Sequence, residues 1–192
     1  MLLITGFRPF TTGLGLKLDH NPTADIARRV AEGSSSVVAE VLPVSYRRTK
    51  ESFLGLLSTH QPEHWIGLGY APHRTTLDIE AIALNLEHAE RGDNDGERPW
   101  MRPIVEGGPT AYNAKLDLKG TIQRLAERDV SAMASFHAGT FLCNQTFYLG
   151  CNACEGKGRL KTATFIHVPP MDCYLALESG LKHFIANFTN PE

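Results

Sequence analysis

The sequence predicts an α/β fold, a three-layer αβα sandwich with a mostly parallel, twisted central sheet. Short runs of apolar and β-branched residues alternate along the chain with longer amphipathic segments, which is typical of strands connected by helices. Glycine and proline are scattered between these segments rather than gathered into a linker. No internal repeat or linker divides the 192 residues, so we expect a single domain over residues 1–192.

The first part of the chain contains three expected strands and two expected helices. Pro22 suits the first turn of a helix, where its missing N–H leaves no hydrogen bond unmade, so we expect a helix over residues 21–32. Helical spacing of apolar residues predicts a second helix over residues 46–57. Apolar or β-branched runs predict buried strands at residues 2–5, 37–44 and 65–69.

The second part of the chain continues this alternation. Apolar and polar residues alternate over residues 75–86, which predicts one longer strand. Glycine-rich segments at residues 92–96 and 107–109 predict turns. The remaining expected elements are helices over residues 116–128, 142–154 and 174–186 and strands over residues 131–136 and 162–168.

Charge and hydropathy argue against several classes of function. Nineteen Lys and Arg residues against 21 Asp and Glu residues give a net charge of −2, which offers no reason to expect nucleic acid or an anionic membrane as a partner. No apolar run approaches the ~18 residues of a membrane span. The start, MLLITGF, lacks the charged segment of a signal peptide, so the four cysteines are expected to be reduced thiols. We therefore expect a cytoplasmic protein.

Cys143 is a candidate nucleophile because of its place in the predicted fold. In sheets of this kind ligands bind in the crevice at the carboxyl ends of the strands. Cys143 follows a strand and a turn of small residues, where the next helix is expected to begin. Free backbone N–H groups and the helix dipole favour the thiolate there and could stabilise an oxyanion. A cysteine at this position could equally be a small buried apolar residue.

A nucleophilic cysteine needs a base, and the base needs an orienting group. His137 and His167 both end predicted strands near the expected crevice, and spacing alone does not choose between them. Asp78 and Glu80 alternate onto one face of a predicted strand. A carboxylate inside a strand is costly unless it is paired, and an imidazolium would be a natural partner.

Six short motifs, in order, resemble those of the pyrrolidone-carboxylate peptidase (pyroglutamyl peptidase I) family. The resemblance runs from residue 1 to about Pro169. The matching segments are Thr5-Gly6-Phe7 with Pro9-Phe10 and Asn21-Pro22, Leu42-Pro43-Val44, Ile79-Glu80 with Asn85 and Asp93-Asn94, Pro109-Thr110-Ala111-Tyr112, Ala138-Gly139 with Leu142-Cys143-Asn144, and Phe165-Ile166-His167-Val168-Pro169.

This resemblance implies a three-layer α/β fold and a cysteine peptidase that removes N-terminal pyroglutamate from peptides through an acyl-enzyme, without metal or cofactor. It assigns the nucleophile to Cys143, the base to His167 and the orienting group to Glu80. It also implies a homo-oligomer, a dimer or tetramer. The substrate-binding residues that it implies are Phe7 and Phe10 against the lactam ring, with Asn21, Tyr70, Phe141 and Arg91. Ordinary core packing would also explain Phe7 and Phe10.

Three departures from the family pattern set limits on this interpretation. Glu90 stands where the family usually has an arginine, and we expect Arg91 to replace it by facing the crevice while Glu90 turns to solvent. Tyr70 stands where Gln or Leu is common, and the segment after His167 is short. A relative that keeps the fold and binds lactam peptides with weak or lost turnover is therefore an alternative.

A second alternative is a zinc or redox site. Cys151 and Cys154 have the Cys-x-x-Cys spacing of a dithiol or of half a zinc site, and Cys173 and one of the histidines could join them. The pair falls within a predicted helix, however, and a second Cys-x-x-Cys is missing from the sequence.

Overall fold

The computed structural model describes residues 1–11, 18–170, 179, 180 and 182 of the chain. Its main element is a six-stranded sheet with the order β2-β1-β3-β8-β4-β7. Four of the five strand pairs are parallel, which confirms the predicted mostly parallel sheet. The strands are β1 (Leu2–Phe7), β2 (Val37–Leu42), β3 (His64–Tyr70), β4 (Leu77–Glu80), β7 (Ala132–Ser135) and β8 (Thr162–Val168).

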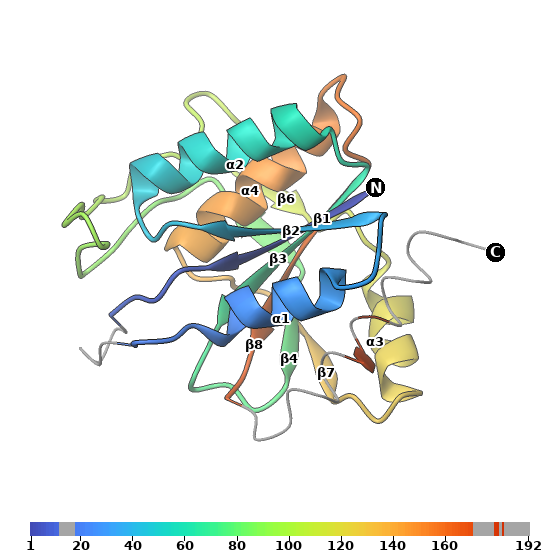
Figure 1. The fold of residues 1–192 in the computed structure, drawn as a ribbon. Coiled ribbons are helices and arrows are strands. Elements are labelled where there is room, and N and C mark those ends of the chain that lie inside the picture. Colours follow the sequence, from blue (N-terminus) through green and yellow to red (C-terminus); the bar gives the residue numbers. More distant parts are fainter. Residues whose placement is uncertain (12–17, 171–178, 181, 183–192) are drawn as a thin grey trace.

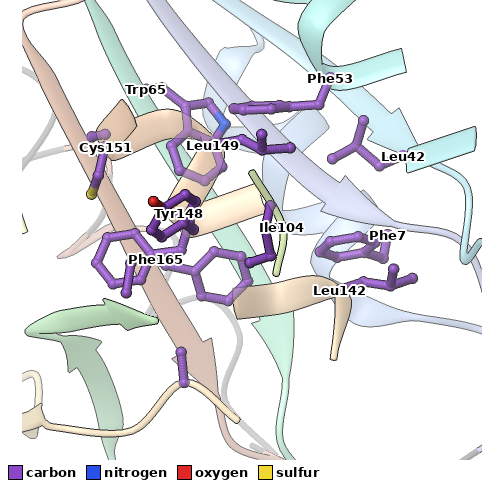
Figure 2. Packing of buried hydrophobic residues seen from close by; sticks show 14 of the residues in the cluster. Phe7, Leu42, Phe53, Trp65, Ile104, Leu142, Tyr148, Leu149, Cys151 and Phe165 are labelled. Atoms are coloured by element: carbon purple, nitrogen blue, oxygen red, sulfur yellow. The ribbon is translucent and has the colours of Figure 1, made fainter. Parts of the chain in front are cut away.

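Helices cover both faces of the sheet, so the described part of the chain forms the three layers that the sequence predicts (Figure 1). On one face α1 and α3 pack on the sheet, and their cluster includes Ile26, Leu125 and Ile166. On the other face lie α2 and α4, whose apolar residues surround Trp65 and Phe165 (Figure 2). The helices are α1 (Pro22–Ala31), α2 (Tyr46–His60), α3 (Leu118–Ala126) and α4 (Leu142–Glu155).

The helix on residues 21–32 begins as its sequence predicts. Asn21 is the N-cap of α1, and its side-chain oxygen accepts hydrogen bonds from Thr23 N at 3.1 Å and from Thr23 Oγ1 at 2.8 Å. Pro22 occupies the first helical position, where no N–H is required. The hydroxyl of Thr23 in turn accepts from Phe7 N at 3.1 Å. The helix start is thereby attached to the end of β1, at the edge of the sheet where the site lies.

The single strand predicted over residues 75–86 is two strands, and that prediction is wrong. β4 ends at Glu80, and β5 (Ile82–Leu84) pairs antiparallel with β6 (Ala111–Asn113) in a separate two-stranded sheet. Ala81 is the crossing point, because its N–H donates to Ser135 O at 2.7 Å while its own carbonyl accepts from Ala114 N at 2.8 Å. Side-chain alternation continues across such a crossing, so the pattern does not reveal it.

One strand pair of the mostly parallel sheet is antiparallel. β4 is antiparallel to β8, with Asp78 opposite His167, and β7 runs parallel to β4. Glu80 is therefore a diagonal neighbour of His167 across this antiparallel pair, within reach of a long side chain. The final helix predicted over residues 174–186 lies largely outside the described residues. Within those residues, no helix is long and apolar enough to cross a bilayer.

Candidate active site

The structure brings Cys143, His167 and Glu80 together from three elements. Cys143 is in the first turn of α4, His167 is near the end of β8, and Glu80 is the last residue of β4. The Nδ1 atom of His167 lies 2.7 Å from Oε1 of Glu80, and Cys143 is the other neighbour that acts on the His167 ring. Since Nδ1 faces Glu80, Nε2 is the ring nitrogen that remains for Cys143. His167 and Glu80 are 7% and 0% exposed.

The charges around His167 favour its protonated form. Burial opposes protonation of the ring, but the neighbouring Cys143 and Glu80 outweigh that effect, and the pKa of His167 rises to about 9. The imidazolium is then the dominant form of His167 at neutral pH. This arrangement can supply both a nucleophile and a proton donor without external activation.

Gly69 makes the approach of Cys143 and His167 possible, and the sequence analysis missed it. It lies opposite His167 in the parallel register of β3 and β8. A Cβ atom at this position would lie 2.9 Å from Cys143 Sγ and 3.0 Å from His167 Cδ2. The first distance is shorter than real Cβ contacts and the second is tighter than most of them, so a side chain at position 69 would force Cys143 or His167 to shift. The apolar run in β3 predicts a buried strand and gives no indication that Gly69 has this role.

The first turn of α4 carries backbone donors that no side chain caps. Phe141 is the N-cap residue and makes no side-chain capping hydrogen bond. Asn144 instead binds the chain at β5, since its Oδ1 accepts from Leu84 N at 2.9 Å and its Nδ2 donates to Leu84 O at 2.9 Å. The helix start is thus held in place while its N–H groups and positive dipole end are directed at the region around Cys143. Such donors can stabilise a thiolate or an oxyanion.

The structure distinguishes the two candidate histidines. His137 is exposed, and its Nδ1 accepts a hydrogen bond from Gly139 N at 2.9 Å. Gly139 has a φ angle of 80°, so this bond belongs to a tight turn that precedes α4. His167, in contrast, is buried between Glu80 and Cys143.

A cavity of about 160 Å³ opens beside Cys143 and His167. Its walls contain five of the six predicted substrate-binding residues and are mostly apolar. Phe7 is buried at its wall, whereas Phe10 and Tyr70 are half-buried. The complete lining consists of Phe7, Phe10, Asn21, Val44, Gly69, Tyr70, Ala138, Phe141, Leu142, Cys143 and His167.

Arg91, the sixth predicted residue, lies in the wall of a neighbouring hollow of about 340 Å³, together with Glu90 and His88. Phe10 and Phe141 separate and line both cavities. The Glu90 side chain is 80% exposed and lies 3.2 Å from His88 Nε2, so it turns away from Cys143 as predicted. Arg91 is also exposed, and it does not line the cavity that contains Cys143.

The Cys-x-x-Cys pair is poorly suited to metal or redox chemistry. Cys151 and Cys154 lie in α4, and burial raises their pKa values to about 12 and about 11. Both roles require thiolates, which these environments disfavour. The residues that the structure describes contain no group of three or more His, Cys, Asp or Glu placed to hold a metal ion. Cys173 lies outside the described residues.

Comparison with known proteins identifies the family of this chain. The pyroglutamyl peptidase family model matches residues 1–182. Pyrrolidone-carboxylate peptidase of Pyrococcus furiosus is 39% identical over 171 residues, which are 88% of this chain and 80% of the relative. The relative of that name from Gloeobacter violaceus is 36% identical over the same share of this chain and 80% of its own.

Solved structures give the same result. Pyrrolidone carboxyl peptidase from Thermococcus litoralis superposes with a TM-score of 0.87 at 31% identity, over 96% of this chain and 91% of that chain. Pyroglutamyl peptidase I from Bacillus amyloliquefaciens superposes with a TM-score of 0.84 at 29% identity, over 95% and 93% of the two chains. This chain therefore belongs to the pyroglutamyl peptidase family.

Proposed function

We propose that this chain is a cysteine peptidase that removes an N-terminal pyroglutamyl residue (5-oxoproline) from peptides. The observation that carries the proposal is the buried contact of Glu80 with His167, and of His167 with Cys143, at the wall of an apolar cavity. Family membership supports the same activity. In this proposal Cys143 is the nucleophile, His167 the acid and base, and Glu80 the group that orients His167.

The first half of the reaction forms an acyl-enzyme. The Cys143 thiolate attacks the carbonyl carbon of the pyroglutamyl residue, and the oxyanion that develops is stabilised by backbone N–H groups at the start of α4. The C–N bond then breaks, and the His167 imidazolium gives its proton to the departing amine. The products are a pyroglutamyl thioester on Cys143, a free peptide amine and a neutral His167.

The second half restores the enzyme. Neutral His167 removes a proton from water as the water oxygen attacks the thioester carbon. The C–S bond breaks, pyroglutamate leaves, and the Cys143 thiolate and the His167 imidazolium are regenerated. Glu80 accepts a hydrogen bond from Nδ1 throughout, which keeps Nε2 directed at Cys143.

The cavity suits a small, uncharged ring. Phe7 and Phe10 offer aromatic surface against which the lactam ring would lie, and Tyr70 and Phe141 complete the walls. Asn21 has few hydrogen-bonding groups left for a substrate, because its Oδ1 caps α1 and its Nδ2 donates to Arg8 O at 3.2 Å. The second N–H of that amide is the atom we propose for the lactam carbonyl.

The position of Arg91 favours one second candidate, a protein that binds lactam peptides with weak or lost turnover. If polarisation of the scissile carbonyl requires an arginine, Arg91 would have to reach it from the neighbouring hollow. The complete set of Cys143, His167 and Glu80 favours turnover instead.

One assay separates the two candidates. Release of 7-amino-4-methylcoumarin from its pyroglutamyl amide is measured beside the prolyl amide, which lacks the lactam carbonyl, and beside the Cys143→Ala variant. We expect release only from the pyroglutamyl amide and only with Cys143 present. Binding of the pyroglutamyl amide without release, seen by calorimetry, would favour the binding protein; neither binding nor release would reject both.

Two further properties remain predictions. We propose a cytoplasmic location and a homo-oligomer, either a dimer or a tetramer, and these rest on the sequence and the family resemblance alone. Light scattering coupled to size-exclusion chromatography measures the oligomeric state directly.

A further inference from the structure

Arg74 connects Glu80 to its surroundings, and neither the sequence motifs nor the mechanism above includes it. Its guanidinium forms an ion pair with Asp78 and donates hydrogen bonds to Ser135 Oγ at 3.0 Å and to His137 O at 3.2 Å. Its Nη2 atom also lies 3.5 Å from Glu80 Oε1, the oxygen that contacts His167. The side chain is 20% exposed, so these contacts are largely shielded from water.

We propose that Arg74 is a positioning residue for the reaction, one that holds the charged Glu80 in place behind His167. The inference rests on the proposed peptidase function. Arg74 acts through Glu80 and does not itself touch the reacting atoms.

The charge balance around Glu80 supports this role. Glu80 is fully buried, and its Oε2 atom has no hydrogen-bond partner among the described residues. A buried carboxylate is costly unless a cation accompanies it. Two cations lie close to it in the described part of the chain, His167 and Arg74. When His167 passes its proton to the leaving amine it becomes neutral, and Arg74 then remains as the cation that stabilises Glu80.

Asp78 makes the same cation more important. It is 6% exposed and alternates onto the same face of β4 as Glu80. Thr76 Oγ1 donates to Asp78 Oδ1 at 2.7 Å, and Arg74 binds the other oxygen. Without Arg74, two carboxylates would stand side by side in a poorly hydrated place, and their repulsion would displace Glu80 from His167.

Arg74 also connects the carboxylates to the turn before α4. The His137 carbonyl that accepts its hydrogen bond precedes Ala138, which lines the cavity beside Cys143. A guanidinium has five donors in a fixed plane, so it can bind Asp78, Ser135 and His137 at once. A lysine at this position would keep the charge but lose most of these bonds.

The test is a double-mutant cycle between Arg74 and Glu80. Arg74→Gln removes the charge and keeps a side chain that can hydrogen-bond. We expect it to lower kcat on the pyroglutamyl amide by about tenfold or more, with KM changed less than about threefold. In the Glu80→Gln background the same change should lower kcat less than about threefold, because the carboxylate on which Arg74 acts is gone.

Two more variants separate positioning from folding. Arg74→Lys keeps the charge and should recover most of the kcat that Arg74→Gln loses. Arg159→Met is the control. Arg159 precedes β8, is exposed and pairs with Glu63 at 3.3 Å, so its removal should leave kcat unchanged. Thermal unfolding of each variant shows whether the protein still folds. If Arg74→Gln fails to fold, Arg74→Lys replaces it in the cycle. A loss of kcat in the parent that is smaller in the Glu80→Gln background supports the role of Arg74, and equal losses overturn it.

A second readout does not require turnover. Alkylation of Cys143 by iodoacetamide at neutral pH, followed by peptide mass spectrometry, reports the thiolate that His167 and Glu80 support. Arg74→Gln should slow alkylation in the parent and not in the Glu80→Gln background. Equal losses in both backgrounds, in kcat or in alkylation, would overturn the role of Arg74. A parent that is alkylated as expected but does not cleave the amide would overturn the proposed function alone.

Discussion

Gly69 lies opposite His167 in the register of β3 and β8, and a Cβ atom at position 69 would point at the sulfur of Cys143. A methyl group at position 69 would also lie 2.8 Å from the Phe165 ring. The cysteine and the histidine therefore approach each other through a gap that one additional carbon atom would fill. This relationship gives a direct test of how closely the two groups must lie.

Gly69→Ala should lower kcat by about tenfold or more, because a displacement of about 1 Å at a reacting group can cost two orders of magnitude. Gly55→Ala is a matched control: Gly55 lies in α2, and a Cβ there meets no atom within 4 Å. It should leave kcat unchanged and stabilise the helix by about 0.5–1 kcal/mol. Steady-state kinetics and thermal unfolding of both variants check this, and equal kcat values would contradict it.

Cys143→Ala should abolish hydrolysis and leave the fold intact, because it removes the nucleophile with little change in volume. Cys151→Ala, Cys154→Ala and Cys173→Ala should each keep most of the activity. The coumarin assay and circular dichroism provide the two measurements. Near-parental turnover by Cys143→Ala would show that another group is the nucleophile.

His167→Ala should lower kcat by about 10²–10⁴-fold, the usual effect of removing a positioned acid and base. His137→Ala should have a far smaller effect, since its ring is exposed and binds the turn at Gly139. Glu80→Gln should fall between them, because an amide can still accept from Nδ1 but carries no charge to stabilise the imidazolium. The opposite ranking of the two histidines would transfer the role of base to His137.

The raised pKa of His167 predicts a specific pH dependence. Turnover requires the imidazolium, so kcat/KM should decline as the pH rises through about 9. The pKa is raised from 6.5 in the unfolded chain, so protonated His167 stabilises the folded state fully below about pH 6.5, and this stabilisation is lost as the pH rises through about 9. Denaturant unfolding across this range should show the loss in the parent and a flatter profile in His167→Gln. Equal pH dependence of the free energy of unfolding in the two proteins would exclude His167 as the origin of the loss.

The sequence predicts the layers, the parallel strands and the start of α1 because these depend on local patterns. The split at Ala81 depends on its backbone partners, because its N–H donates to Ser135 O while its carbonyl accepts from Ala114 N. Side-chain alternation carries no information about these partners. His167 and His137 are equivalent by spacing, and only the register of β4 against β8 brings one of them to Glu80. The family resemblance points to His167 without information on that register.

Gly69 and Arg74 illustrate what the sequence leaves out of a site. Gly69 matters because it leaves empty the space that a Cβ atom would fill beside Cys143 and His167. Arg74 matters because its partners come from β4, from the end of β7 and from the turn that follows β7. Neither carries a local pattern. Arg91 shows the opposite case, where adjacency to Glu90 in the sequence suggested a place beside Cys143 and the structure puts it across the Phe10–Phe141 wall.

The antiparallel pairing of β4 with β8 determines when in folding Glu80 and His167 come together. Glu80 and His167 are 87 positions apart, so their contact closes a long loop whose entropy must be overcome before it forms. A chain emerging from the ribosome carries Cys143 before it carries β8, and until β8 docks the cysteine lacks its base. In the proposed mechanism, Cys143 therefore lacks its base while the chain is incomplete and acquires it only when β8 is in place.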